Sequence, residues 1–141
     1  MRKGRLGLCL LLISLILVHG PVWAEWLAID NRYQSPGLQT VYIDPDTLRK
    51  EGNLVTVSAL IDWTWMQGNR SPTRFYSTKL TKQIDCAEVR VRTLAATDYY
   101  GHMGTGEVIG GGGHSSEGHW IGIEPGTINQ GLWEAVCGKA E

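Results

Sequence analysis

The stretch from Leu80 to Leu94 constrains the fold most, because it joins a strand-like alternation to Cys86, one of the chain's three cysteines. In its second half, small or apolar residues alternate with charged ones: Ala87, Glu88, Val89, Arg90, Val91 and Arg92. A period of two is typical of a β-strand with one solvated face. Around Cys86 the apolar positions change parity, so we expect a bulge or bend there.

The first 24 residues have the pattern of a secretory signal peptide. A basic start precedes an apolar run from Leu6 to Val18, and Val22 and Ala24 place small residues at a cleavage site. The alternative is a membrane anchor, but the run is about thirteen residues, whereas a membrane-spanning helix needs roughly twenty. We therefore expect cleavage after Ala24 and a single domain formed by residues 25–141.

The mature chain is mildly acidic. Loss of Arg2, Lys3 and Arg5 lowers the number of basic residues from 13 to 10, against 14 acidic residues, which leaves a net charge of −4. This charge gives no general attraction to nucleic acid or anionic lipid. No later apolar run approaches membrane-spanning length. We expect no nucleic-acid partner and no stable membrane span after signal removal.

Two cysteines remain after signal removal, Cys86 and Cys137, because Cys9 lies within the predicted signal peptide. In an exported chain such a pair predicts a disulfide. The alternative is the reactive thiol pair of a redox enzyme, but the chain has no Cys-x-x-Cys motif. A bridge would attach the C-terminal segment to the middle of the sheet.

The remaining alternation predicts an antiparallel meander. The clearest strand pattern runs from Val55 to Trp65, with apolar side chains at the odd positions and Leu60 as the exception among the even ones. Other strand-like segments are 26–30, 40–43, 75–84, 87–100, 105–109 and 120–123. Short connections favour antiparallel pairing. After Asp44-Pro45 we expect a helical turn at 47–50. The expected fold class is α+β, mainly β, with a sheet of about six strands.

The last predicted element is a short helix. Thr127 is a good N-cap and Gly138 a suitable stop, and the residues between them place an apolar stripe at helical spacing: Ile128, Leu132, Ala135 and Val136. A helix of about ten residues is marginal alone in water, so it must pack on the sheet. A bridge from Cys137 would place it on the face to which Cys86 points. The opposite face and the strand edges, where Glu88, Arg90 and Arg92 offer charge, would then be open to a partner.

Glycine and histidine dominate residues 101–118, which hold His102 and His114, with His119 just beyond. The three imidazoles are a candidate zinc or copper site. The alternative is a loop that carries histidines without a metal, because a glycine-rich loop does not preorganise ligands. We favour the loop. No serine stands in a nucleophile-elbow pattern, and we predict no catalytic residue, no metal site and no cofactor.

Trp63 and Trp65 share one face of the clearest strand. We expect them in the core. The alternative is that they line a recognition surface on an open sheet.

An ordered set of motifs spans nearly the whole mature chain: Trp26, Tyr42–Leu48, Ile84-Asp85-Cys86, Arg90 with Arg92, Gly101-x-x-Gly104-x-Gly106, and Pro125–Ile128 leading to Leu132-Trp133-x-x-x-Cys137. This set resembles the surface-adhesin protein E family of Gram-negative bacteria. The resemblance implies an antiparallel sheet with a C-terminal helix tethered by the disulfide. It also implies export to the periplasm or the outer-membrane surface, and adhesion to host matrix proteins. The chain departs from a surface-anchored adhesin in lacking a lipobox.

Two classes of function follow. The first is an exported binding or adhesion domain without catalytic activity, whose partners are host extracellular-matrix or envelope proteins. The second is a small periplasmic enzyme or metal-handling protein that uses His102, His114 and His119.

Overall fold

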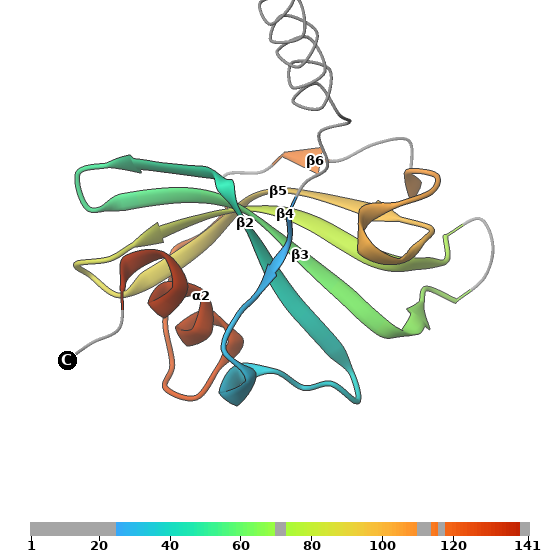
Figure 1. Cartoon of the computed structure of the whole chain (residues 1–141). Coiled ribbons are helices and arrows are strands. Elements are labelled where there is room, and N and C mark those ends of the chain that lie inside the picture. Colours follow the sequence, from blue (N-terminus) through green and yellow to red (C-terminus); the bar gives the residue numbers. More distant parts are fainter. Residues whose placement is uncertain (1–24, 70–72, 110–113, 116–117, 139–141) are drawn as a thin grey trace, which may run out of the picture.

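One antiparallel sheet forms most of the structure, a computed structural model that describes residues 25–69, 73–109, 114–115 and 118–138. The strands follow one another in the order β1-β2-β3-β4-β5-β6, and β7 also pairs with β5 (Figure 1). Their bounds are β1 Leu27–Ala28, β2 Gln39–Glu51, β3 Leu54–Gln67, β4 Phe75–Asp85, β5 Arg90–Tyr99, β6 His114–Ser115 and β7 Ile121–Gly122. The predicted meander, mainly β with one C-terminal helix, is confirmed.

Two predicted segments lie outside the described residues, and one predicted strand is shorter than expected. The predicted signal peptide, residues 1–24, and the glycine run 110–113 lie outside the described residues. Within the described part of the chain, none of the helices has the length and apolar character needed to cross a membrane. The strand predicted at 105–109 is reduced to a single bridge between Tyr99 and Val108.

β2 continues through the segment where the sequence predicts a helical turn, so that prediction is wrong. The pairing of β2 with β3 shifts register between Asp44 and Arg49. Within the irregularity, Asp44 Oδ1 accepts a hydrogen bond from the Asp46 amide at 3.1 Å. The Thr47 hydroxyl donates to the Asp44 carbonyl and accepts from the Ser58 amide of β3. This hydroxyl keeps the two strands attached where their backbone pairing is interrupted.

β3 buries side chains on both of its faces. Val55, Val57 and Ala59 on one face are at most 1% exposed. Leu60 points to the other face and is also fully buried. The 3-10 helix η2 (His102–Gly104) lies against β3 and β4, and a Cβ added at Gly104 would be 3.6 Å from Leu60 Cδ1. The η2 turn therefore covers the second face locally.

α2 (Ile128–Cys137) begins and ends where the sequence indicates. The Thr127 hydroxyl accepts a hydrogen bond from the Gln130 amide, and Gly138 follows the helix with a φ of 89°. Leu132 is 2% exposed and packs in the core of the sheet. Ala135 is exposed, which corrects its place in the predicted apolar stripe. Trp133 packs against the core instead, together with Ile128 and Val136.

The predicted disulfide joins Cys86 to Cys137. The change of parity near Cys86 is a hairpin turn, because β4 ends at Asp85 and β5 begins at Arg90. Asp85 accepts hydrogen bonds from the Glu88 amide and from Arg90 Nε, both at 3.1 Å. The Glu88 amide first, and Arg90 next among the favourable contacts, hold the pKa of Asp85 below its ordinary value. The turn that carries Cys86 is therefore held by Asp85 on one side of the cysteine and by Glu88 and Arg90 on the other.

The 3-10 helix η1 (Asn31–Tyr33) packs against α2 through Glu134. The Tyr33 hydroxyl donates to Glu134 Oε1 at 2.9 Å, and Arg32 Nη2 lies 3.2 Å from Oε2. The hydrogen bond to Glu134 raises the pKa of Tyr33. Gly131 allows this close approach, because a Cβ there would lie 2.8 Å from Ile29 Cδ1.

Candidate functional site

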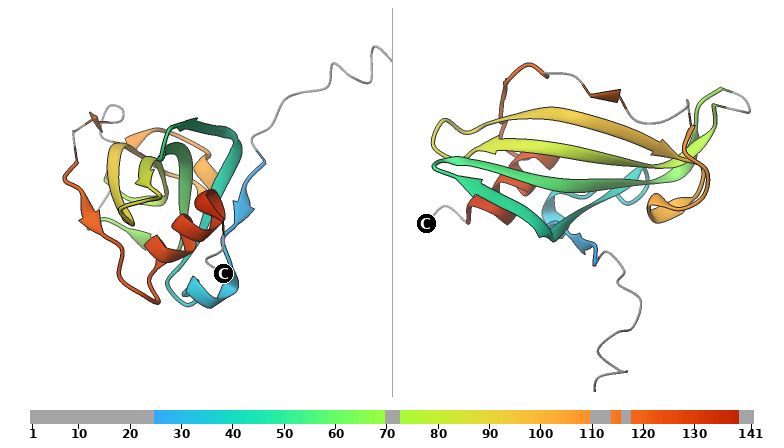
Figure 2. Two further views of the ribbon diagram at one scale, coloured as in Figure 1. Left: turned by 90° about the vertical axis from the view of Figure 1, so that its left-hand side faces the viewer. Right: turned by 90° about the horizontal axis from the view of Figure 1, so that it is seen from above.

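The end of the sheet away from α2 carries the features that sequence analysis marked as functional. α2 and η2 lie near opposite ends of the strands (Figure 2). His102 belongs to η2, and Trp63 and Trp65 belong to the last residues of β3. We call this region the open end and define it as residues 35–38, 62–67, 76–77 and 98–105.

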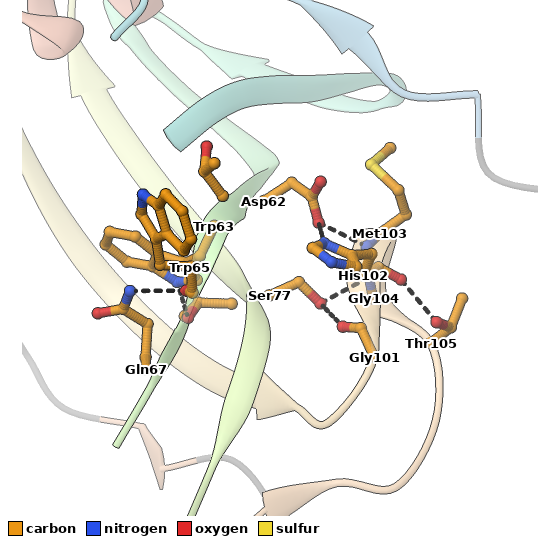
Figure 3. A network of polar contacts seen from close by, with 12 residues as sticks. Asp62, Trp63, Trp65, Gln67, Ser77, Gly101, His102, Met103, Gly104 and Thr105 are labelled. Carbon is orange, nitrogen blue, oxygen red and sulfur yellow. Dashed lines mark hydrogen bonds and ion pairs between the residues drawn. The ribbon is translucent and has the colours of Figure 1, made fainter. Parts of the chain in front are cut away.

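Asp62 of β3 organises the η2 turn. Its Oδ1 accepts a hydrogen bond from the Met103 amide at 2.9 Å and lies 3.0 Å from His102 Nδ1. Met103 has a φ of 56°, in the left-handed region that is uncommon for residues other than glycine. The carboxylate thus stabilises a backbone conformation that is otherwise unfavourable (Figure 3). The His102 ring also packs against Tyr76, with 4.4 Å between ring centroids and an angle of 34° between the ring planes.

Ser77 fixes the other side of the same turn. Its hydroxyl donates to the Gly101 carbonyl at 2.6 Å and accepts from the Gly104 amide at 2.8 Å (Figure 3). The residue is 0% exposed. Although an aspartate, a histidine and a serine lie within one network, the serine hydroxyl bonds to the backbone rather than to the imidazole. Ser77 and Asp62 thus both hold the backbone of η2.

The three histidines of the candidate metal site are distributed along β5. His102 follows the C-terminal end of β5, and the backbone of His114 pairs with Ala96 in its middle. His119 precedes Trp120, which lies against arginines at the start of β5. Among the described residues there is no group of three His, Cys, Asp or Glu side chains that could hold a metal ion.

Trp63 is half-buried and joined to a polar chain across three strands. Its indole N–H donates to Thr78 Oγ1 at 3.2 Å, and the Thr78 hydroxyl donates to Asp98 Oδ1 at 2.8 Å. Figure 3 shows Trp63 and Trp65 on the side of β3 away from His102. The predicted core position of Trp63 is thus only partly realised.

Trp65 is 68% exposed, so its predicted place in the core is wrong. The paired register of β2 on β3 ends at Gln39 and Trp63, which leaves no β2 residue to cover Trp65. Nevertheless the ring is held, because its indole N–H donates to the Gly37 carbonyl at 3.2 Å. Leu38 in the same turn is 51% exposed. The turn that holds the indole thus also carries an exposed leucine.

The turn at residues 35–38 is attached to β3 by its backbone. The Thr64 amide donates to the Leu38 carbonyl at 3.0 Å, and the Thr64 hydroxyl donates to the Pro36 carbonyl at 2.9 Å. Gln67 Nε2 also donates to the Trp65 carbonyl at 2.9 Å. The support for Trp65 therefore comes from several independent contacts.

Arg90 and Arg92 are used inside the domain, which changes the expected role of this charged edge. Both guanidinium groups lie 4.5 Å from the centre of the Trp120 ring. Arg90 Nε also donates to Asp85, and Arg92 Nε donates to Gln83 Oε1 at 2.8 Å. These contacts hold the segment before β7 against β5. The two arginines are therefore held in contact with Trp120 and do not form a free cationic patch.

Sequence reasoning found His102 but missed Asp62, Tyr76 and Ser77. The signal for Asp62 was a carboxylate in the middle of a strongly apolar strand. Its partners lie 40 and 41 residues away, so no local pattern could identify them.

Comparison with known proteins decides the family. The family model for surface-adhesin protein E matches residues 26–138. The chain belongs to this family. Membership implies an exported or cell-surface protein of the adhesin type. No curated protein sequence matches the chain.

Solved structures of protein E from Haemophilus influenzae share the fold. One crystal form has a TM-score of 0.61 at 14% sequence identity, with 83% of this chain and 90% of that chain covered. A second structure has a TM-score of 0.60 at 15% identity and covers 86% and 92%. The protein from a non-typeable strain has a TM-score of 0.57 at 14% identity and covers 83% and 78%. At these identities the likeness concerns the fold.

Proposed function

We propose that the domain is an exported protein-binding module that holds its partner through the open end, with Trp65 as the main anchor. The observation that carries the proposal is the state of Trp65, which is 68% exposed and yet hydrogen-bonded to Gly37. Tryptophan is enriched among the residues that contribute most to protein–protein binding. Membership in a family of surface adhesins supports a binding role.

The support beneath Trp65 favours tight binding. A side chain that is already fixed before association loses less conformational entropy when a partner covers it. Its indole is fixed by Gly37, and the turn that provides this carbonyl is itself attached to Thr64. Leu38, in the same turn as Gly37, adds exposed apolar surface to the open end. A partner with an apolar pocket and polar groups at its rim would fit this arrangement.

The proposed partners are host extracellular-matrix proteins or bacterial envelope proteins, and the proposed role involves no catalysis. The family name supports adhesion as the class of activity. The backbone bonding of Ser77 supports a structural role for the polar network of the open end. The proposed location is the periplasm or the outer surface of the cell.

Solid-phase binding tests the proposal. The disulfide-bonded mature domain is applied to immobilised matrix proteins and to envelope extract, and is compared with Trp65→Ala. Loss of a hot-spot residue costs about 2 kcal/mol or more, so we expect binding to weaken by about 30-fold. Ile121→Ala is the matched control, because Ile121 is 60% exposed on β7 at the other end of β5.

Circular dichroism of each variant confirms that the fold is kept. The proposal fails if Trp65→Ala binds as well as the wild type. It also fails if Ile121→Ala weakens binding as much as Trp65→Ala does.

A further inference from the structure

A separate pocket of about 370 Å³ lies between the first turn of α2 and the sheet. Apolar side chains from three strands and the helix form most of its wall: Val41, Ala59, Ile61, Leu80, Ile128 and Leu132. Pockets that bind small molecules have volumes of about 300–1,000 Å³ and mainly apolar walls with few polar groups. This pocket has the same character. It belongs to the α2 end of the sheet, so it is distinct from the open end.

Lys82 is the charged residue of this pocket. Its ammonium group donates to the Thr93 hydroxyl at 2.7 Å. It forms no ion pair with any carboxylate in the described part of the chain. Burial lowers the pKa of Lys82. A lysine ammonium has three donors, so contact with Thr93 leaves donors for another acceptor.

We propose that this pocket binds a single-chain amphipathic carboxylate, a medium-chain fatty acid such as decanoate. The alkyl chain lies among the apolar side chains, and the carboxylate accepts hydrogen bonds from Lys82 Nζ. Charge complementarity argues for this ligand, because a partly desolvated cation without an acidic partner favours an anion. The small volume argues for one acyl chain rather than a folded partner.

The alkyl chain and the carboxylate of the ligand each have a matching part of the pocket, apolar in one case and cationic in the other. Ile61 and Leu80 lie on neighbouring strands and are partly buried against the core. Lys82 is two residues beyond Leu80 on β4, and therefore on the same face of the sheet. An apolar tail and an anionic head on one molecule can thus contact Leu80 and Lys82 together.

Titration calorimetry with decanoate tests this assignment on the disulfide-bonded mature domain. We expect saturable binding of one decanoate per chain. Lys82→Met keeps the apolar stem and removes the charge, and should weaken binding by about tenfold or more, as expected for loss of a charged hydrogen bond. Lys79→Met is the matched control, because Lys79 is exposed on the same strand and is absent from the pocket. 1-Decanol, with the same chain and no charge, should bind more weakly than decanoate.

Two further measurements keep the test decisive. Asn129→Phe narrows the pocket from the helix side and should weaken decanoate binding without removing the lysine. Amide chemical shifts at Ile61, Leu80 and Ile128 should move on titration of the wild type.

The proposal is overturned if decanoate shows no saturable binding below its self-association concentration. Equal affinity for decanoate and 1-decanol would overturn it, and so would unchanged affinity in Lys82→Met. Tighter binding of a short apolar peptide with a free C-terminal carboxylate would overturn the fatty-acid assignment.

Discussion

Leu132→Ala should destabilise the domain strongly, because Leu132 is the most deeply buried apolar side chain of α2. It is 2% exposed and belongs to the core cluster of the sheet. Truncation of buried leucine to alanine costs about 2–5 kcal/mol, and the cost grows with the cavity that remains. Leu132 also lines the pocket beside α2, so it lacks packing partners on one side. We therefore expect a loss of about 2–3 kcal/mol in the free energy of unfolding, or a fall of roughly 10 °C in Tm.

Urea unfolding followed by circular dichroism and tryptophan fluorescence measures this loss. Ala135→Gly is the matched control, because Ala135 is exposed on the same helix. That substitution should cost only the difference in helix propensity, about 1 kcal/mol. If Leu132→Ala costs no more than Ala135→Gly, α2 does not derive its stability from packing on the sheet, and the account of the core is wrong.

Three further substitutions test contacts around α2 and the hairpin. Gly131→Ala should lower Tm although alanine is the better helix former by about 1 kcal/mol, because its Cβ would lie 2.8 Å from Ile29 and 2.9 Å from Tyr33; a higher Tm would refute the close packing. The pKa of Asp85 is lowered by folding, so its stabilisation is present above the unfolded pKa of about 3.9 and is lost as the pH falls through the folded pKa. Asp85→Asn should therefore differ from the wild type in urea midpoint at neutral pH and converge with it in acid; a constant difference would contradict this. The pKa of Tyr33 is raised by Glu134, so its stabilisation is present below about pH 10 and is lost as the pH rises through the folded pKa. Tyr33→Phe should remove that alkaline loss, which a Tm series in alkaline buffers measures.

Local signals predicted the elements whose boundaries depend on neighbouring residues. Thr127 and Gly138 mark the two ends of α2, and both act there as N-cap and C-cap. Alternation predicted the long strands, since period two depends only on which side chains face the core. The bridge from Cys86 to Cys137 followed from cysteine number in an exported chain.

Features that depend on distant residues escaped prediction. Trp65 has the same parity as Val55 and Val57, but only the pairing with β2 and the position of α2 decide that the core ends before it. Leu60 looked like an exception to the pattern because η2, which covers it, is more than forty residues away. Likewise the helical turn predicted after Asp44 is absent because Thr47 binds the Ser58 amide of the next strand. Alternation shows which residues share a face, but not what covers that face.

Side-chain footprinting of the mature domain with its captured partner tests the central claim most directly. Hydroxyl radicals oxidise exposed tryptophan, and Trp65 is 68% exposed in the free domain. If the partner binds the open end, oxidation of Trp65 and of Leu38 falls on binding, while oxidation of Ile121 on β7 stays unchanged. Protection of Ile121 with full oxidation of Trp65 would place the partner elsewhere and contradict the proposed function.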